Sequence, residues 1–434
     1  MNESSSRRII IVSHFCPFPP VHGNRRRFIS LLKWFRSRGF SVIYILQPLD
    51  VDDGDGIAQL RTLVDRLDIV RSPDAWPTAL LKHVSRGIAR TLLPEPVKVR
   101  LRHLINRIRQ PVASVKETWG TGDVEGDGHI DRWCWSTTCG VVHRAVKRYS
   151  PIAVMTEYAL LSKCLDGVPP ATLKVIDTVE VFFRNQERFH VDGLTVPFVC
   201  SPDSEMTSLN RADVLVAIQG NDTQALKEMF PGKQIVTAPY TYQEGRPRAS
   251  SPDAATVLYV ASSNPFNVHG LQQFLKEAWP PILKRVPDAT LRVVGGVASV
   301  LRIDAPQVTN VGRVSDEQLA REYQTASVVI NPQVAGTGLK IKCVEALSAG
   351  CPVVMNQAGA DGLEKGAGAA FLLARDWREF SDNVVRILTD AGLRRQLEKE
   401  ARAFATDNFS PEATFSELER TLSLRNNRVD SQSI

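Results

Sequence analysis

The sequence has no apolar run long enough to cross a membrane. The longest run near its start covers residues 9–12, far short of a signal-peptide core, and no later run approaches the roughly 20 residues that a bilayer requires. We therefore expect a cytoplasmic protein. Its seven cysteines form no Cys-x-x-Cys pair, and an odd number in a long chain favours reduced thiols over a disulfide framework.

Metal-ligand patterns occur only as fragments. The Asp-x-Asp at residues 50–52 lies in a glycine-containing loop, and the calcium-like segment at residues 123–128 is followed by a cysteine where a bidentate glutamate is needed. Cys134 and Cys139 lie near two histidines with a spacing that matches no common zinc site. We predict no metal and no resident cofactor.

The composition is that of a folded protein with two domains. A chain of 434 residues exceeds one ordinary hydrophobic core, and 43% hydrophobic and 23% charged residues are close to globular averages. The net charge of +6 is uneven, because residues 82–110 carry eight Lys or Arg and one acid. Residues 25–38 add six basic residues without an acid. Such blocks indicate an anionic partner, either phosphate or an acidic membrane surface.

Short β-branched runs alternate with helical patterns, which predicts parallel sheets with crossover helices. Strands are expected first at residues 8–13, 40–46, 152–156, 173–177, 213–219 and 234–238. A second series is expected at residues 257–261, 290–294, 327–331 and 352–355, with helices at 270–285 and 316–325.

A polar stretch rich in Pro, Gly and Ser separates the two series. It predicts an N-terminal domain at residues 1–239, a linker at 240–256 and a C-terminal domain at 257–409. An amphipathic helix should follow at 410–424 and a disordered tail at 425–434. The expected architecture is α/β, with two doubly wound Rossmann-like domains that face a cleft, where open parallel sheets bind ligands.

The most informative stretch is VAGTGLKIKCVEALSAGCPVVMN, which reads as a strand end, a glycine loop, a helix and another strand. Gly336 and Gly338 let backbone N–H groups approach an anion at the start of the helix, where the helix dipole also favours negative charge. Lys340, expected in the first turn, is unfavourable there unless an anion is bound. Glu345 lies two turns after Gly338, so its carboxylate could accept hydrogen bonds from a ribose. The alternative is a tight turn followed by a solvated Lys342–Glu345 pair.

This stretch resembles family 4 glycosyltransferases of the GT-B type, together with VLYVASSNPFNVHGLQQFL upstream and RADVLVAIQ at residues 211–219. The resemblance is strongest to a branch of bacterial polysaccharide enzymes and covers residues 257–404 well. It implies that Glu345, which matches the second glutamate of a Glu-x7-Glu motif, contacts the ribose of a nucleotide-sugar. It also implies metal-independent transfer with retention of anomeric configuration.

Two parts of the family pattern are missing on the donor side. The first glutamate of the motif falls on Thr337, and the segment Ser262-Ser263-Asn264-Pro265 lacks the Arg and Lys that members often use to neutralise the diphosphate. The resemblance therefore leaves Lys340, the backbone amides of the glycine loop and Asn264 to bind the donor.

The expected catalytic segment also departs from the family. Relatives show Ile-Asp-Thr-His-Asp at the end of an N-domain strand, with the histidine close to the reacting sugar, whereas residues 176–180 read Ile-Asp-Thr-Val-Glu. Val179 thus replaces the histidine, and Asp177 and Glu180 are the candidate catalytic residues. Retaining transfer needs mainly stabilisation of the diphosphate and positioning of the acceptor, so loss of one side chain need not abolish it.

Residues 16–24 resemble the family's proline-rich loop after the first strand, which faces the cleft. Gly23 permits close approach of the backbone to phosphate or acceptor, and Asn24 is a candidate helix cap. Three arginines then crowd the positive end of the following helix, at a cost of roughly 0.3 to 1 kcal/mol per charge unless an anion compensates. We expect at least one of them to meet a phosphate, the alternative being solvation: Arg25, Arg26 and Arg27.

The basic segment at residues 82–110 intersperses Leu, Ile and Val with its charges. It reads either as an amphipathic helix on an anionic membrane surface or as a surface helix packed on the N-terminal sheet. No aromatic platform accompanies the charge, so nucleic acid is not expected. The protein would then lie peripherally on the inner face of the membrane.

The sequence as a whole predicts a glycosyltransferase that moves sugar from a nucleotide-sugar to a saccharide or lipid-linked acceptor in polysaccharide or glycoconjugate biosynthesis. One alternative is a nucleotide-sugar epimerase of similar architecture. Another is a degenerate transferase kept as a binding or scaffold subunit, which the changes at Val179 and Thr337 keep open.

Overall fold

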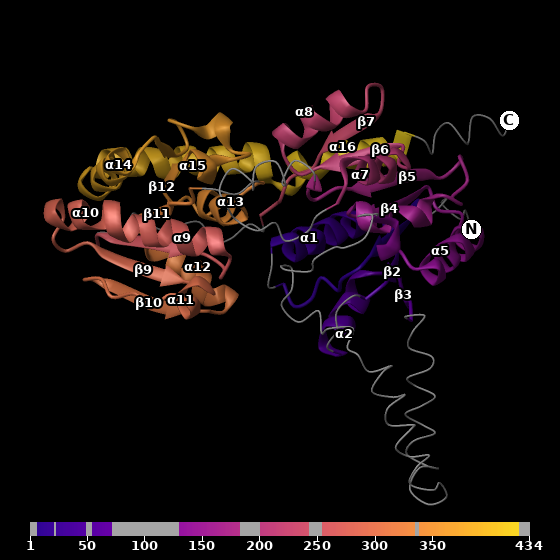
Figure 1. Ribbon diagram of the computed structural model, residues 1–434, viewed down its shortest axis with the longest axis horizontal. Helices are drawn as coiled ribbons and strands as arrows, with labels where there is room; N and C mark the ends of the chain where they lie inside the picture. Colours follow the sequence, from indigo (N-terminus) through magenta and orange to yellow (C-terminus); the bar gives the residue numbers. More distant parts are fainter. Residues whose placement is uncertain are drawn as a thin grey trace, which may run out of the picture.

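The computed structural model describes residues 7–20, 23–48, 54–71, 130–182, 200–242, 254–334 and 338–424. These residues form two halves, each built around a parallel β-sheet with helices packed against it (Figure 1). The figure shows the first half in indigo and magenta beside the second half in orange and yellow.

The first sheet has the order β3-β2-β1-β4-β5-β6-β7 in the described residues. The chain reverses its direction of travel across the sheet between β1 and β4, where Ile9 pairs with Ala153 and Val12 with Thr156. The carboxyl ends of these two strands therefore border the crevice in which doubly wound sheets bind ligands. The strands are β1 Arg7–Ser13, β2 Phe40–Leu46, β3 Arg66–Ile69, β4 Ala153–Glu157, β5 Leu173–Asp177, β6 Val214–Ala217 and β7 Gln234–Thr237.

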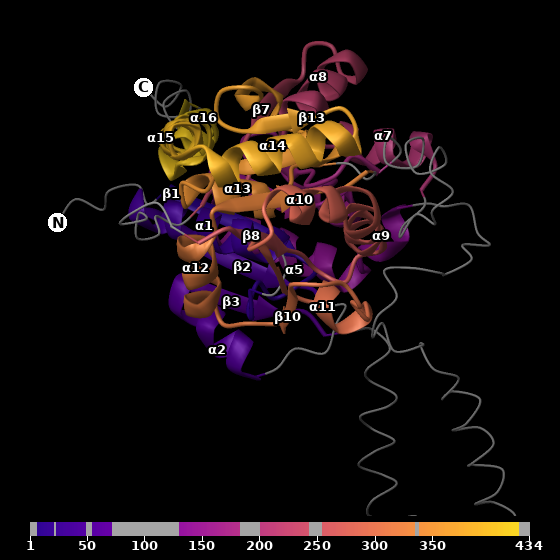
Figure 2. The same ribbon diagram turned by 90° about the vertical axis from the view of Figure 1, so that its left-hand side faces the viewer.

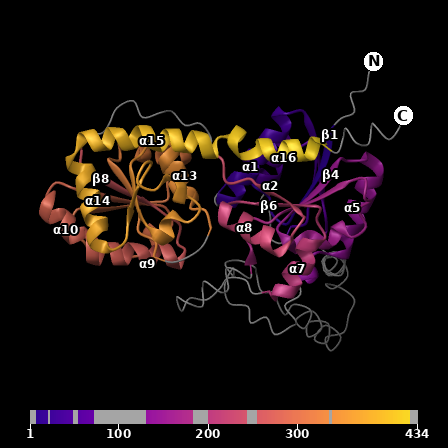
Figure 3. The same ribbon diagram turned by 90° about the horizontal axis from the view of Figure 1, so that it is seen from above.

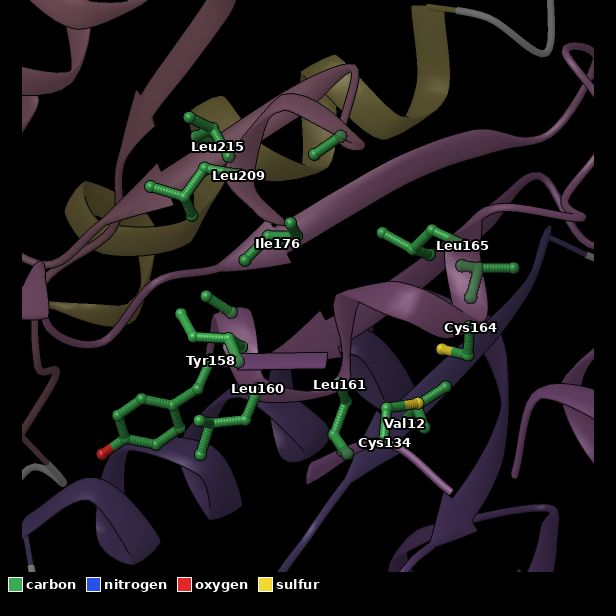
Figure 4. Close-up of a cluster of buried hydrophobic side chains, with 14 of the residues drawn as sticks. Val12, Cys134, Tyr158, Leu160, Leu161, Cys164, Leu165, Ile176, Leu209 and Leu215 are labelled. Carbon is green, nitrogen blue, oxygen red and sulfur yellow. The ribbon is translucent and has the colours of Figure 1, made fainter. Parts of the chain in front are cut away.

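Helices cover both faces of this sheet because its strands carry apolar side chains on both sides. Figure 4 shows one of the two cores, to which Val12, Ile176 and Leu215 of the strands contribute together with Leu161 and Leu165. The helices are α1 Gly23–Ser37, α2 Gly54–Leu63, η1 Ile130–Trp133, α5 Ser136–Tyr149, η2 Ala159–Leu165, α7 Pro202–Asn210 and α8 Gly220–Met229.

The second sheet has the order β10-β9-β8-β11-β12-β13 in the described residues, with its reversal between β8 and β11. The loop after β8 and the loop between β11 and α13 (Ile341–Ser348) therefore lie side by side at the carboxyl ends of the strands, where the sequence predicts donor binding. The strands are β8 Thr256–Val260, β9 Thr290–Val294, β10 Val308–Gly312, β11 Val328–Asn331, β12 Val353–Asn356 and β13 Leu372–Ala374.

The helices of the second half divide between its two faces. Side chains from α9, α10 and α14 share one buried cluster, and α12, α13 and α15 contribute to the other. At the end of this half that lies farthest from the first half, α10 packs on α14 (Figure 1, Figure 2). The helices are α9 Pro265–Gln273, η3 Phe274–Ala278, α10 Trp279–Arg285, α11 Val297–Val300, α12 Asp316–Thr325, α13 Ile341–Ser348, η4 Gln357–Ala360, η5 Glu364–Gly366, α14 Trp377–Thr389, α15 Ala391–Phe409 and α16 Pro411–Leu424.

The last helix crosses back to the first half. Figure 3 shows α15 lying over the second half and α16 continuing over the first. Phe415, Leu418 and Leu422 of α16 are fully buried in the core formed by α1 and the first sheet. The apolar face of α16 therefore packs on the first half, although α16 begins about 170 residues after the last strand of that half, β7, ends at Thr237.

Two details of the expected organisation are corrected. The first residues of the predicted linker, Tyr240 to Tyr242, are buried, and both tyrosines pack in the core of the second half. Thr241 Oγ1 donates to the Phe409 carbonyl at 2.8 Å, which ties this crossing to the end of α15. The strands β3, β10 and β13 were absent from the prediction because these edge strands are only partly buried, so they need few apolar residues in a row.

Candidate functional site

Glu345 accepts hydrogen bonds from three separate parts of the chain. It lies in the second turn of α13, where its Oε1 accepts from Tyr240 Oη at 3.1 Å and from Arg26 Nη1 at 3.4 Å. Its Oε2 is 3.5 Å from Tyr323 Oη, the outer limit of a hydrogen bond. Burial raises the pKa of Glu345, and the charge of Arg26 opposes that rise. Only 18% of the Glu345 side chain is exposed to solvent.

This carboxylate lines a cavity of about 460 Å³ between the two halves. The walls come from α1 of the first half and from α12 and α13 of the second, with aromatic residues of the chain crossing between them. The side chain thus faces a ligand-sized space, as a nucleotide-binding carboxylate must. The other lining residues include Phe18, Pro20, Arg26, Ile29, Tyr240, Tyr242, Asp316, Leu319 and Tyr323.

The loop before α13 holds the other predicted donor residues. Gly336 and Thr337 lie outside the described residues, but Gly338 has φ of 84° and its N–H donates to Asp361 Oδ2 at 2.7 Å. Lys340 occupies the N-cap position, so its prediction in the first turn was wrong by one residue. Its Nζ donates to the Gly338 carbonyl at 2.7 Å, and the side chain is buried. Lys340 therefore stabilises the loop in this conformation.

Lys342 is a second cation at the start of α13 that sequence reasoning treated only as a solvated partner of Glu345. That alternative is wrong, because Nζ of Lys342 donates to Asn267 Oδ1 at 2.7 Å and lies 5.1 Å from the ring centre of Tyr259. Burial lowers the pKa of Lys342 to about 8, and the nearby charge of Lys340 acts in the same direction. The first turn of α13 contains no acid. The sequence signal for Lys342 was its position three residues before Glu345.

Asn264 lies at the carboxyl end of β8 and serves as the N-cap of α9. Its Oδ1 accepts from the Phe266 N–H at 2.9 Å, so the side chain satisfies the start of this helix. It does not line the cavity at Glu345. Asn267, one turn into α9, is the residue that meets Lys342, and its Nδ2 donates to Ser262 Oγ at 3.1 Å. The loop after β8 therefore approaches α13 through Asn267.

The end of the proline-rich loop, at Gly23, packs against the second half. A Cβ on Gly23 would lie 2.2 Å from Cδ1 of Ile341, so the absence of a side chain lets α1 approach the start of α13. Asn24 lies inside the first turn of α1, which corrects its assignment as the cap before the helix. Arg25 places its guanidinium carbon 5.7 Å from the ring centre of Phe15.

Arg27 and Asp177 form a buried ion pair rather than facing a ligand. Arg27 Nη1 donates to Asp177 Oδ2, while Nε and Nη2 donate to the Ala238 carbonyl at 3.2 and 2.7 Å. Both side chains are almost fully buried. Arg27 thus joins α1 to the end of β5 and to the segment that leads into the second half. A contact of Arg27 with phosphate stays a prediction.

A second carboxyl group lies beside Asp177. Glu157 is the last residue of β4 and pairs in register with Asp177 on β5, and its Oε2 accepts from Ser13 Oγ. Burial raises the pKa of Glu157 well above its ordinary range, and the charge of Asp177 adds to the rise. Glu157 therefore favours its neutral form beside the buried ion pair of Asp177 and Arg27. Sequence reasoning missed Glu157 because no motif marks it.

The turn after β5 has an unusual backbone. Val179, at the position of the family's histidine, has φ of 54°, a region that costs a β-branched residue of order 1–3 kcal/mol. The turn directs Glu180 outward, and this residue is exposed. The two candidate catalytic carboxylates therefore differ, since Asp177 is enclosed and Glu180 reaches the surface.

Several expectations lie outside the described residues, including the Asp-x-Asp at 50–52, the basic segment at 82–110 and the calcium-like segment at 123–128. Within the part of the chain that the structure describes, no group of three or more His, Cys, Asp or Glu could hold a metal ion. The sulfur atoms of Cys134 and Cys139 are 3.8 Å apart as thiols. No described helix is both long and apolar enough to span a membrane.

Comparison with known proteins finds a family match in the second half, the half that carries Glu345, Lys340 and Lys342. Residues 254–390 match the family model described as Glycosyl transferases group 1. The chain is 25% identical over 172 residues to a Klebsiella pneumoniae protein described as an uncharacterized 44.6 kDa protein in the cps region. The matched region is 37% of this chain and 44% of the Klebsiella protein, less than half the length of that relative.

Solved structures resemble the whole chain in fold. Sucrose-phosphate synthase from Thermosynechococcus elongatus has 16% identity and a TM-score of 0.62, and covers 96% of this chain and 99% of its own. A TarM structure has 11% identity and a TM-score of 0.63, with 98% and 100% covered. Anabaena HepE in complex with UDP and glucose has 13% identity and a TM-score of 0.56, with 96% and 99% covered. The predicted GT-B fold is confirmed, and with the family match it supports glycosyl transfer as the general class of activity.

Proposed function

We propose that this protein is a family 4 glycosyltransferase that moves a sugar from a nucleotide-sugar to a saccharide or lipid-linked acceptor, with retention and without a metal. The observation that carries the proposal is Glu345, a largely buried carboxylate that lines a cavity between two halves of a GT-B fold. A carboxylate accepts two hydrogen bonds from the vicinal hydroxyls of a ribose without needing to titrate. The nucleoside would therefore bind against α13.

The diphosphate of the donor would lie at the start of α13. Lys342 and Lys340 supply two positive charges there, and the helix dipole adds to their field. When the glycosidic bond to the diphosphate breaks, negative charge grows on the leaving group, and cations held in a partly buried site stabilise it more strongly than water does. Lys342 has an amide and an aromatic ring around it, so an anion would restore its charge balance.

The carboxyl groups of the first half would orient the reaction. Asp177 holds Arg27 and through it the segment that enters the second half, so we propose it as a positioning residue. Glu180 remains the proposed carboxylate nearer the reacting sugar. Retaining transfer that depends on diphosphate stabilisation and orientation is compatible with Val179 in place of histidine.

The proposed substrates draw support from the similar proteins. HepE is described with UDP and glucose, and S. aureus TarM with α-GlcNAc-glycerol and UDP. The Klebsiella relative is described as lying in the cps region, which supports a role in polysaccharide biosynthesis. Gly23 and Arg25 would face the acceptor side, and a lipid-linked acceptor would bring the protein to the inner face of the membrane. Salt-sensitive binding to vesicles that contain acidic lipid tests that last step.

A thermal-shift screen against UDP-, GDP- and ADP-sugars tests the donor site, because a ligand that binds only the folded state raises the melting temperature. Glu345→Gln keeps the shape of the side chain but replaces one carboxylate oxygen with an amide NH2 group, which cannot accept a hydrogen bond. We expect it to lower the affinity for the identified nucleotide-sugar at least about tenfold, the loss of one charge-assisted hydrogen bond. Glu417→Gln, an exposed change on α16, is the matched control. Equal donor affinity in the Glu345→Gln variant would remove the proposed site.

Product analysis with the identified donor separates the chemistries. A transferase places the sugar on an acceptor, an epimerase returns an isomerised donor or free sugar, and a degenerate transferase binds without turnover. Retention of configuration is read from the anomeric signal of the product by NMR. Activity that persists after dialysis against EDTA supports transfer without a metal.

A further inference from the structure

The two halves are joined at the candidate site by one arginine. Arg26, on α1 of the first half, donates from Nη2 to Asp316 Oδ1 at 2.7 Å and from Nη1 to Glu345 Oε1 at 3.4 Å. Its Nε donates to the Pro20 carbonyl at 3.1 Å, which fixes the guanidinium in place. We call the contacts of Arg26 with Asp316 and Glu345 the Arg26 bridge. The bridge lies in the wall of the cavity described above.

The bridge uses the carboxylate that a nucleotide would need. Oε1 of Glu345 already receives Arg26 and Tyr240, and Oε2 receives Tyr323. A carboxylate has about four acceptor positions, so a ribose with two hydroxyls finds too few of them unoccupied. The guanidinium also occupies the space next to Oε1. Ribose and the Arg26 bridge therefore compete for one group.

The three donors to Glu345 differ in how freely they can leave. Tyr240 and Tyr323 pack in the buried core of the second half, the same half that carries Glu345. Arg26 belongs to the first half and is only partly buried. A small movement of the halves, or a change of the Arg26 side chain, removes this donor and leaves the tyrosines in place. Arg26 is thus the donor that a ligand displaces at least cost.

We propose that the Arg26 bridge closes the empty site and that donor binding breaks it, so that Arg26 is a positioning residue which couples nucleotide binding to the junction between the halves. The inference rests on the proposed function, because it requires a ribose at Glu345. Exclusion of this kind is reciprocal, since whatever weakens the bridge strengthens nucleotide binding by the same free energy. An ion pair that is partly exposed sets the scale at about two- to fivefold in affinity.

The test measures binding of UDP, GDP and ADP, and of uridine, guanosine and adenosine, to the wild type and to Arg26→Met by calorimetry. We expect Arg26→Met to bind the matching nucleoside about two- to fivefold more tightly. The nucleoside isolates the competition for Glu345, because it has no phosphate that Arg26 could attract. Asp316→Asn, at a carboxylate that is 63% exposed, weakens the bridge from its other end and should act in the same direction. Arg321→Met, an exposed change on the same helix as Asp316, is the control.

Each outcome decides the proposal. Tighter nucleoside binding in Arg26→Met, with little further gain in the double variant Arg26→Met/Asp316→Asn, supports it, because both changes act through one pair. Unchanged or weaker nucleoside binding in Arg26→Met, in a variant whose melting temperature and circular dichroism match the wild type, overturns this inference and leaves the proposed function standing. If neither the wild type nor Arg26→Met binds any of the six compounds, both fail. Binding by Arg26→Met alone supports both.

Discussion

Lys342 should make the binding of a nucleoside diphosphate depend on pH above neutrality. Burial lowers the pKa of its ammonium to about 8 in the empty protein. A bound diphosphate favours the charged form and raises that pKa again. Affinity should therefore be constant below about pH 7 and fall as the pH rises through 8, because binding then requires a proton to be taken up.

The size of the effect follows from the protonated fraction. With a pKa of about 8, roughly nine tenths of Lys342 is charged at pH 7 and roughly one tenth at pH 9, so affinity should fall about tenfold over this interval if the neutral amine contributes little. This change corresponds to about 1.4 kcal/mol of binding free energy. In buffers of different ionisation enthalpy, calorimetry at pH 8 should also record proton uptake.

Three variants make this measurement decisive. Lys342→Gln should bind more weakly at pH 7 and lose the dependence between pH 7 and 9, apart from any slope that comes from the ligand itself. Lys342→Arg should keep its charge and flatten the profile in the same way. Lys399→Gln, an exposed change on α15, should retain the wild-type slope. Identical slopes in the wild type and Lys342→Gln would refute the role of this ammonium.

Three further predictions concern packing and protonation. Gly23→Ala places a methyl group 2.2 Å from Ile341 Cδ1, and the overpacking, which costs about 1–3 kcal/mol, should weaken donor affinity. Ile341→Ala should restore that affinity. A double variant that does not recover would contradict this contact. Because burial raises the pKa of Glu157 in the folded state, the free energy of unfolding in urea should fall as the pH rises above the unfolded value of 4.5, by up to about 1.4 kcal/mol per pH unit. Glu157→Gln should lose this part of the pH dependence, so parallel curves for the wild type and the variant between about pH 5 and 8 would contradict the prediction. Leu418→Ala should lower the free energy of unfolding by about 2–5 kcal/mol, because Leu418 is fully buried. Glu417→Gln, an exposed change on the same helix, should leave the free energy of unfolding nearly unchanged. An equal effect of both variants would refute the packing of α16.

Much of the architecture could be predicted from local pattern. The strands at residues 40–46, 173–177 and 290–294 have the observed bounds, because each is rich in β-branched and other apolar residues and is preceded by Gly or Pro a few positions away. The helix at residues 316–325 is also as predicted, since Ser315 caps it. Short strands near the edges carry a weaker signal, and the three-residue β13 has too little sequence to show any alternation.

The candidate site divides differently between sequence and structure. The sequence predicted Glu345 on a helix that follows a glycine loop, but it counted two helical turns from Gly338, whereas α13 begins only at Ile341 and Glu345 lies in its second turn. The partners of Glu345 could not be predicted in this way. Arg26 lies more than 300 positions earlier, and Asp177 finds Arg27 across 150 positions. No local pattern carries contacts of that separation.

The sequence by itself thus determined the alternation of strands and helices, the two-domain division and the face of α13 that carries Glu345, because each depends on residues within a few turns of one another. The tertiary structure alone decided that Lys342 donates to Asn267, that Asp177 is paired with Arg27 and that α16 completes the first half. Burial and charge pairing depend on which segments meet, and the packing of the two sheets and their helices settles that.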